Sequence, residues 1–472
     1  MAKDDLAFKP AWELRDLIAS RKVSPVELTE MYLRRIEALN PKLNAYLTVT
    51  ADEALASAKK AEQAVMRGQR LGPLHGVPIS IKDLEMTRGT RTTFGSLIYK
   101  DFVPEIDSVV VERVRKSGAI ILGKTNTPEF GLSATTENRV ADPCRNPWDP
   151  QRTPGGSSGG AGAALIAGLC AIATGSDGGG SIRIPCSFTG TYGIKPTQGR
   201  VPRYGGVGKT APNQTSQSGP MSRTVKDSAI LLQVLSGHDP RDPISLQQRP
   251  PNFLAALDKG VRGLRIAWSG NLGYAAVEPE VMEATSKAAR VFEELGATVE
   301  EPNLALSEPY PPFFDLFSTN TYAAYGHLYE EQRDKLADYS VTFMEHGKKV
   351  TGAQYARVIR YIDGLKLQMD TFMKRYDLLL TPSMAVVAFP IGRRPTKIAG
   401  RDSDPWWGFM PFTFPFNMTG QPAASIPCGF SKEGLPMGLH IIGRRGDEAT
   451  VLRASAAFEQ ARPWHSRRPP VS

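Results

Sequence analysis

The stretch RTPGGSSGGAGAALIAGLCAIATGSDGGGSIRIP occupies residues 152–185 and contains two clusters of glycine and serine. GGSSGG lies at residues 155–160 and GGGS at residues 178–181, and small apolar residues separate the two clusters. Glycine at this density carries a cost in conformational entropy, so we expect it to serve a purpose. A run of backbone N–H groups that points into one cavity forms a site for an anion or an oxyanion. A serine at the end of such a run indicates acyl transfer.

On either side of this stretch, predicted strands alternate with predicted helices. Residues 161–173 predict a helix between the two clusters. SPVE at residues 24–27 predicts the start of another helix, which Asn40-Pro41 ends. Further helices are predicted over residues 51–67, 108–116, 223–236, 280–295, 318–375 and 448–460, strands over residues 75–83, 119–122, 264–268, 297–300 and 378–381, and a hairpin over residues 423–427 and 437–442 with Gly434 in its turn. The alternation indicates an α/β sheet that helices cover on both faces.

The composition is that of a large folded enzyme. The chain has 472 residues, of which 41% are apolar, and a net charge of +9. We find no internal repeat and no linker, and we predict one domain over residues 1–472, with N-terminal helices in residues 1–67, a catalytic core segment in residues 75–236, and the remaining sheet and helices in residues 264–460. Because no dense basic stripe with interleaved aromatic residues is present, we expect no nucleic-acid partner.

The ends and the cysteines indicate a cytoplasmic protein. The start, MAKDDLAFKPAWEL, lacks the apolar segment of a signal peptide. The longest weakly polar run, residues 159–175, is too short and too rich in Gly and Ala to cross a membrane. No C-x-x-C pair occurs among the cysteines, which are Cys144, Cys170, Cys186 and Cys428. We therefore expect reduced thiols and no zinc site.

A lysine interrupts the apolar strand predicted over residues 75–83, HGVPISIKD. On this strand Val77, Ile79 and Ile81 point one way, and Ser80 and Lys82 point the other. Burial lowers the pKa of a lysine by up to about 3–5 units, and a neutral lysine is a usable base near pH 7. The alternative interpretation is a lysine at a strand end that reaches solvent or pairs with the adjacent Asp83.

The first serine cluster also matches a rival motif. GGSSG at residues 155–159 contains G-x-S-x-G, the nucleophile elbow, with Ser157 as its serine. That motif follows a strand, whereas NPWDP at residues 146–150 predicts a loop. An elbow enzyme also needs a later Asp and His. The sequence around the later histidines does not indicate a catalytic role for any of them; they are His238, His327, His346, His440 and His465.

Two further motifs are weaker. Ser57-x-x-Lys60 has the S-x-x-K form of penicillin-recognising enzymes, but it lies on a charged, Ala-rich helix and is typical of a solvated face. Gly208-Lys209-Thr210 resembles the end of a phosphate-binding loop. That loop needs a glycine at position 203, where this chain has Arg, so we do not expect phosphate binding there.

Taken together, these motifs resemble the amidase signature family of serine hydrolases. The matching segments are Gly76-Val77-Pro78-Ile79 with Lys82-Asp83, GGSSGG at residues 155–160, GSDGGGSIRIP at residues 175–185, Gly193-Ile194-Lys195-Pro196-Thr197 with Gly199-Arg200, SPVE at residues 24–27, GQP at residues 420–422 and PMG at residues 436–438. The resemblance covers nearly the whole chain. It implies the amidase-signature fold, which has a large mixed β-sheet, and a Ser-cisSer-Lys triad.

The resemblance assigns a role to each residue of the triad. Ser181 is implied as the nucleophile, Ser157 as the bridging serine after a cis peptide bond, and Lys82 as the base. Lys82 would take a proton through Ser157, the amine would leave protonated, and water would cleave the acyl-enzyme. The implied oxyanion hole consists of the N–H groups of Gly178, Gly179, Gly180 and Ser181. Neither a metal nor a cofactor is implied.

Two positions depart from the glutaminase-type members, such as the A-type component of glutamyl-tRNA amidotransferase. Those members typically carry Thr after the Asp and Gln after the Arg of the second cluster, whereas this chain has Gly178 and Ile184. Two polar contacts to a glutamine substrate are therefore missing, and a buried polar group without a partner is costly. The two positions favour a free-standing hydrolase with a less polar substrate.

An aromatic stretch, PWWGFMPFTFPF at residues 405–416, is a candidate substrate pocket. Trp406, Trp407, Phe409 and Phe412 are predicted to line an apolar cavity. The alternative, in which the rings fill the core or a subunit interface, stays open. The overall pattern also resembles amidases that cleave aryl amides and carbamates.

We therefore predict an amidase that acts on carboxamides through an acyl-enzyme, with carbamates (urethanes) and esters as further substrates. The expected partner is a small-molecule amide or carbamate, and a homodimer stays open. The first alternative is an amidotransferase A-type subunit that works only in a complex. The second is a non-catalytic binding module on the same fold, against which the intact Ser181, Ser157 and Lys82 count.

Overall fold

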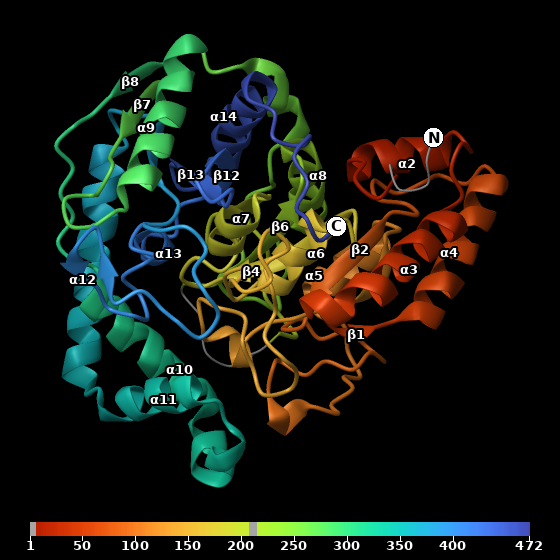
Figure 1. Cartoon of the computed structure of the whole chain (residues 1–472), viewed down its shortest axis with the longest axis horizontal. Coiled ribbons are helices and arrows are strands. Elements are labelled where there is room, and N and C mark those ends of the chain that lie inside the picture. The colour runs from red at the N-terminus through yellow and green to blue at the C-terminus, as the bar shows by residue number, and fades with distance from the viewer. Residues whose placement is uncertain (1–5, 207–214) are drawn as a thin grey trace.

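An eleven-stranded mixed β-sheet runs through the part of the chain that the computed structural model describes, residues 6–206 and 215–472 (Figure 1). Its strands, in order across the sheet, are β1 (Tyr46–Val49), β3 (Ile120–Thr125), β2 (Pro78–Lys82), β4 (Ile172–Asp177), β6 (Gln217–Ser222), β5 (Tyr192–Lys195), β12 (Ala423–Phe430), β13 (Pro436–Gly443), β9 (Leu378–Pro382), β7 (Arg265–Trp268) and β8 (Thr298–Glu300). β2 is parallel to β3 and β4, whereas β4 and β6 are antiparallel. A large mixed sheet was predicted and is confirmed.

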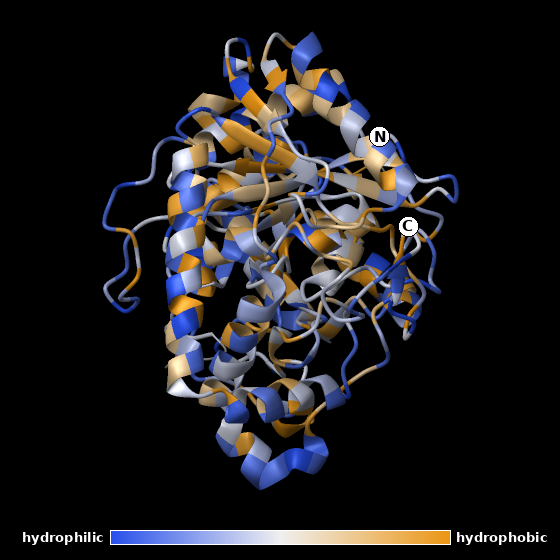
Figure 2. Ribbon diagram, turned by 90° about the vertical axis from the view of Figure 1, so that its left-hand side faces the viewer, coloured by the Kyte–Doolittle hydropathy of each residue, from blue (hydrophilic) through white to orange (hydrophobic). Residues whose placement is uncertain are grey.

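Successive side chains of the strands enter two separate apolar cores. On β9, Leu378 and Leu380 belong to one core, and Leu379 belongs to the other. On β7, Ile266 and Ala267 divide in the same way. Because neighbouring side chains of a strand point to opposite faces, the sheet has one core on each face. The strands in the interior are accordingly mostly orange in Figure 2, and blue is concentrated on the outer helices and loops.

Helices close both cores. The first core receives side chains from α2 (Ala11–Ala19), α3 (Pro25–Leu43), α4 (Ala51–Met66), α5 (Val109–Lys116), α6 (Gly159–Ile166), α8 (Val225–Leu235), α9 (Pro279–Glu294) and α14 (Glu448–Ala461). The second receives them from α10 (Tyr310–Gln332), α11 (Asp338–Lys349), α12 (Gly352–Phe372) and α13 (Pro415–Met418). α7 (Arg183–Thr189) contributes to both, and so does α9, whose Val281 belongs to the second core. In Figure 1, α10 and α11 extend away from the body of the molecule.

The remaining elements are short. Two-residue strands β10 (Lys397–Ile398) and β11 (Arg401–Asp402) pair with each other, and the 3₁₀ helices are η1 (Leu97–Tyr99), η2 (Glu129–Gly131), η3 (Leu254–Lys259) and η4 (Arg333–Lys335). None of the helices in the described part of the chain combines the length and the apolar character that a membrane span requires.

The start of α3 was predicted correctly and its end was not. The Ser24 hydroxyl accepts hydrogen bonds from the N–H groups of Val26 (3.0 Å) and Glu27 (3.3 Å), as expected of an N-cap. The helix does not stop at residue 40 but continues through Pro41 to Leu43. Proline removes one helical hydrogen bond, and in the last turn the N–H of Asn44 still bonds the carbonyl of residue 40 (2.7 Å).

The helix predicted over residues 161–173 is wrong in its second half. α6 ends at Ile166, and Ile172 already begins β4. Gly168 has a left-handed φ of +66°, and the Phe8 ring would lie 2.8 Å from any Cβ at this position. The chain therefore turns at Gly168, where only glycine fits. Strand β4 was missed because its alanine and glycine residues carry no alternating apolar pattern.

Most other predicted elements are present within a few residues of their expected bounds. Strands predicted over residues 264–268, 297–300 and 378–381 are β7, β8 and β9, and the predicted hairpin is β12 with β13. Gly434 lies between these two strands with a φ of +80°. The long helical region predicted over residues 318–375 consists of three helices, and the first of them begins earlier, at Tyr310.

Candidate active site

Lys82 is the last residue of β2, and its ammonium group is completely buried. Its Nζ lies 2.7 Å from Ser157 Oγ, 2.8 Å from Ser158 Oγ, 3.0 Å from Ser176 Oγ and 3.3 Å from the Ser176 carbonyl oxygen. All four partners are uncharged. Burial lowers the pKa of Lys82 to about 7, although the more distant Asp177 and Glu85 act in the opposite direction.

Neither alternative for Lys82 describes the structure. The lysine does not reach solvent, and its neighbour Asp83 contacts other groups. Asp83 accepts hydrogen bonds from the N–H (2.9 Å) and hydroxyl (2.5 Å) of Thr93, and lies 3.4 Å from the ammonium group of Lys124. Lys124 is therefore the ion-pair partner of the Asp83 carboxylate, and the ammonium group of Lys82 contacts only serine residues.

Ser157 follows a cis peptide bond between Gly156 and Ser157. The segment directly before it, from residue 126 to residue 156, contains no strand, so the strand that a nucleophile elbow requires is missing. A Cβ on Gly156 would lie 2.5 Å from the backbone oxygen of Thr135, so this position accepts only glycine. Its neighbour Gly155 has a φ of +81°. The first glycine cluster thus allows the backbone to approach Thr135 closely enough to direct Ser157 toward Lys82.

Ser181 lies in the turn between β4 and α7, and 9% of its surface is accessible. Asp177 fixes this turn, because its carboxylate accepts hydrogen bonds from the N–H groups of Gly180 (2.7 Å) and Ile182 (3.2 Å). Arg183 binds the same carboxylate through two nitrogen atoms, each at 2.9 Å. Burial alone would raise the pKa of Asp177, but Arg183 outweighs burial and holds it well below its usual range.

One of the four predicted oxyanion donors is excluded. The Gly180 N–H is directed at Asp177, and Gly180 is not part of the cavity wall. Gly178, Gly179 and Ser181 do line the cavity. Their N–H groups donate no hydrogen bond to any residue in the described ranges. Three donors therefore remain available to an oxyanion.

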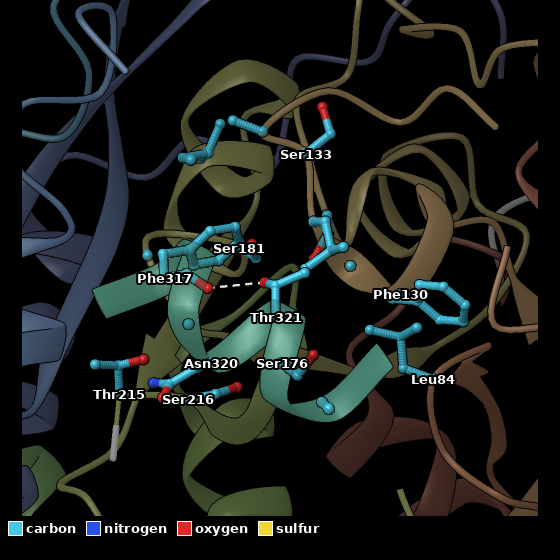
Figure 3. Close-up of a pocket in the computed structure, with 18 of the residues that line it drawn as sticks. Leu84, Phe130, Ser133, Ser176, Ser181, Thr215, Ser216, Phe317, Asn320 and Thr321 are labelled. Carbon is cyan, nitrogen blue, oxygen red and sulfur yellow. Dashed lines mark hydrogen bonds between the residues drawn. The ribbon is translucent and has the colours of Figure 1, made fainter. Parts of the chain in front are cut away.

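A cavity of about 110 Å³ joins the two serines. Ser157, Ser176 and Ser181 lie on its wall, and Figure 3 shows Ser181 between the labelled polar residues Thr215, Ser216 and Asn320 on one side and Phe130 and Leu84 on the other. Half of the other wall residues are apolar, namely Leu132, Ala134, Ile184, Phe317, Ala324, Trp407 and Met410. The cavity thus combines a hydroxyl-rich floor with apolar walls.

Of the four aromatic residues predicted to line the cavity, the structure places only Trp407 there. Phe409 and Phe412 are fully buried in the second core, so for these two the prediction is wrong. Trp406 is half-buried beneath the guanidinium of Arg394, 4.0 Å from the ring centre, and it does not reach the cavity. The composition of this loop alone does not reveal which of its rings faces the cavity.

The sequence interpretation missed the contribution of α10. Phe317, Asn320, Thr321, Ala324 and Tyr325 all line the cavity. Their spacing of three, four, seven and eight residues is that of a single helix face. This pattern was available in the sequence, but nothing in it indicated that the face closes a cavity rather than a core.

The other motifs lie apart from this site. Lys60 is exposed on α4, as expected of a solvated face, and Gly208-Lys209-Thr210 lies outside the described residues. His440 is buried with its Nε2 3.0 Å from Arg183 Nη1, and no histidine occurs among the described residues of the cavity wall. The described chain holds no group of three His, Cys, Asp or Glu side chains placed to bind a metal ion.

Comparisons with known proteins agree over nearly the whole chain. The family model described as Amidase matches residues 27–452. The acylamidase of Rhodococcus erythropolis is 37% identical over 99% of this chain and 98% of its own length. The A-type component of the glutamyl-tRNA(Gln) amidotransferase of Moorella thermoacetica is 40% identical over 98% of this chain and 99% of its own. The crystal structure of a bacterial aryl acylamidase, one of the amidase signature enzymes, superposes with a TM-score of 0.92 at 35% identity and covers 97% of both chains.

Proposed function

The chain belongs to the amidase signature family, and from this premise we propose that it is a serine hydrolase that cleaves carboxamide C–N bonds through an acyl-enzyme on Ser181. The proposal rests above all on the 2.7 Å contact between Lys82 Nζ and Ser157 Oγ. A lysine whose pKa is about 7 is substantially neutral at physiological pH, and it then offers a lone pair to the Ser157 hydroxyl.

The neutral lysine has two N–H groups and one acceptor site for its four partners. Its N–H groups can donate to the Ser176 carbonyl oxygen and to Ser158, both within 3.3 Å. The Ser157 hydroxyl then donates its proton to Nζ. This leaves Ser157 Oγ able to accept a proton in turn, as a bridge between the base and a second serine on the same cavity wall.

Acylation follows from this arrangement. Ser181 Oγ attacks the amide carbon while its proton passes to Ser157 and the Ser157 proton passes to Lys82. The carbonyl oxygen gains charge against the free N–H groups of Gly178, Gly179 and Ser181. As the C–N bond breaks, Lys82 returns its proton through Ser157 to the leaving amine. Water then attacks the acyl-enzyme by the same route and releases the acid.

Carbamates and esters extend the proposal. Both place a carbonyl carbon in front of Ser181 and an oxygen in front of the same N–H groups, so the steps of acylation are shared. An ester differs in its leaving group, which is an alcohol or phenol rather than an amine and depends less on protonation. The apolar wall favours substrates that carry an aryl or alkyl group.

The alternative is an amidotransferase A-type subunit, which the 40% identity to such a protein supports. Two positions of the cavity wall argue against it. Gly178 has no side chain and Ile184 has an apolar one, so neither position supplies a side-chain hydrogen bond to a glutamine substrate. These positions favour a hydrolase that works without a partner chain.

Assay of the purified chain alone tests the proposal. The panel is acetanilide, a primary amide, an aryl carbamate, p-nitrophenyl acetate and glutamine, each with the wild type and with Ser181→Ala. We expect turnover of the anilide and no release of ammonia from glutamine. Turnover of glutamine only, or turnover that needs a partner chain, would favour the amidotransferase. Equal turnover by Ser181→Ala would exclude Ser181 as the nucleophile.

A further inference from the structure

Arg203 is the one charged residue on the described wall of the cavity. No aspartate or glutamate of the described chain lines the cavity. A guanidinium stays protonated at every physiological pH, so the cavity carries a fixed positive charge beside Ser181. The proposed function gives this charge no role.

Arg203 forms no ion pair with any residue that the structure describes. Its Nη1 donates to the carbonyl oxygen of Ser216 at 3.3 Å, whereas its Nε and Nη2 donate to no described residue. Burial lowers the pKa of Arg203, and Glu85 is the carboxylate that most opposes this effect. Among the described residues Glu85 nevertheless forms no ion pair with Arg203, and its carboxylate accepts a hydrogen bond from the Ser218 hydroxyl (2.8 Å). The half-buried Arg203 guanidinium therefore presents N–H groups on the cavity wall that an anionic group of a ligand can bind.

Two further donors face the same cavity from α10. The Oδ1 atom of Asn320 accepts a hydrogen bond from the Tyr355 hydroxyl (3.3 Å), which leaves the Nδ2 donors for the cavity. The Tyr325 hydroxyl has no partner among the described residues, and its ring is held by stacking on Phe130 at 4.2 Å with an interplanar angle of 8°. Figure 3 shows Asn320 beside Ser216, the residue that Arg203 contacts.

We propose that Arg203, together with Asn320 and Tyr325, forms a subsite for a carboxylate, and that the preferred substrates are amides with an apolar body and a carboxylate group. The inference rests on the proposed amidase function. A guanidinium fork with two free nitrogen atoms matches the two oxygen atoms of a carboxylate. Amide and hydroxyl donors complete its solvation, and the surrounding apolar wall holds the body of the substrate.

A pair of isosteric anilides tests the subsite. 4-Acetamidobenzoate and 4-acetamidobenzamide share the same anilide bond and differ in the distal group, which is charged only in the benzoate; release of acetate measures cleavage of the anilide alone in both. We expect the wild-type kcat/KM to be about 10-fold or more higher for the benzoate. Arg203→Met should lower kcat/KM for the benzoate about 10- to 100-fold, mainly through KM, and for the benzamide less than about 3-fold. Arg203→Lys should recover part of the preference.

Controls separate the subsite from a structural role of Arg203. Arg91→Met removes one charge from another half-buried arginine that bonds backbone carbonyls, outside the cavity wall, and should leave the benzoate-to-benzamide ratio unchanged. N-phenylsuccinamate and its carboxamide repeat the comparison with the carboxylate on the acyl side. Should Arg203→Met fail to fold, Asn320→Ala and Tyr325→Phe carry the same test, each with an expected loss of about 3- to 10-fold in the ratio.

The outcomes also distinguish this subsite from the proposed reaction. The subsite is overturned if the wild type hydrolyses the anilides without preference for the charged member of either pair. It is also overturned if Arg203→Met lowers kcat/KM equally for both members of a pair. Either result leaves the proposed amidase reaction intact. If neither anilide is turned over, calorimetric titration with benzoate decides. Binding by the wild type and its loss in Arg203→Met support the subsite without the reaction, and absence of binding overturns it.

Discussion

At the scale of single residues, a depressed pKa does not by itself identify the base. Burial lowers the pKa of both Lys82 and Lys195 to about 7. Lys195 donates to the backbone oxygens of Gln421 (2.5 Å) and Pro196 (3.0 Å) and does not reach the cavity. Lys82 contacts the hydroxyl groups of three serines instead. The partner atoms, and not the pKa, separate a structural lysine from a candidate base.

The first prediction concerns pH. Because burial places the pKa of Lys82 at about 7, the neutral fraction rises as the pH rises, and kcat/KM should increase along an acidic limb with its midpoint near 7. The limb is measured for wild type and Lys82→Ala on a matched amide and p-nitrophenyl ester. The variant should lose the limb and lose amide turnover more than ester turnover. A variant that keeps the limb would show that the base lies elsewhere.

The second prediction concerns the nucleophile. Ser181→Ala should lower kcat about 10⁴- to 10⁶-fold, because the attacking oxygen is removed while the fold is unchanged. A fluorophosphonate probe followed by mass spectrometry should place the label on Ser181 in the wild type. Label on Ser157 would instead revive the nucleophile elbow.

At the scale of elements, the position of Lys82 on a strand could be predicted from the sequence, and the part of the cavity wall that α10 forms could not. Alternation along β2 places Lys82 opposite Ile79 and Ile81, and the two glycine clusters predict close backbone approach. Local pattern carries this information. The packing of α10 over the cavity involves a segment far away in the chain, and the small residues of β4 give no periodic signal. Such features depend on tertiary contacts that a single sequence does not display.

The third prediction uses two adjacent alanines of α10. Ala324 lines the cavity, and Ala323 is exposed on the outer face of the helix. Ala324→Phe should lower kcat/KM for a bulky aryl amide about 10-fold or more, because the ring occupies space that the substrate needs. Ala323→Phe is the matched control and should stay close to wild type. Equal effects of the two substitutions would mean that α10 does not bound the substrate.

The fourth prediction contrasts two glycines. Gly364 lies in the middle of α12 with no atom within 4 Å of an added Cβ, so Gly364→Ala should stabilise the protein by about 0.5–1 kcal/mol. At Gly156 a Cβ would meet the backbone of Thr135 at 2.5 Å, and Gly156→Ala should cost about 1–3 kcal/mol or more together with activity. Urea unfolding monitored by circular dichroism measures both. A stable and active Gly156→Ala would contradict the close approach.

At the scale of the whole molecule, a buried polar network behind the cavity joins parts of the chain that are far apart in sequence. Arg183 on α7 binds Asp177 at the end of β4, Asn417 on α13 (2.6 Å) and His440 on β13 (3.0 Å). Burial and Arg183 together hold the pKa of His440 well below its usual range, so its Nε2 accepts the hydrogen bond from Arg183. The turn that carries Ser181 is thus fixed by residues from the second half of the chain.

The fifth prediction tests this network through Asp177→Asn. The substitution leaves the buried Arg183 without a counter-charge, and it should lower the free energy of unfolding by about 3–5 kcal/mol. It also weakens the anchor of the Gly180 N–H, so kcat should fall in whatever protein remains folded. Glu112→Gln is the control. It breaks the ion pair with Arg241 at the surface and should cost less than about 1 kcal/mol.

The stability that Asp177 contributes should depend on pH in a definite direction. The pKa of Asp177 is lower in the folded protein than in the unfolded chain, so its ionisation contributes stability above the unfolded value of about 3.9. That contribution is lost as the pH falls below this value toward the folded pKa. The stability difference between wild type and Asp177→Asn should therefore be largest near neutral pH and shrink below about pH 4. A difference independent of pH would mean that shape and hydrogen bonding at Asp177, rather than its charge, hold the two halves of the chain together at the nucleophile.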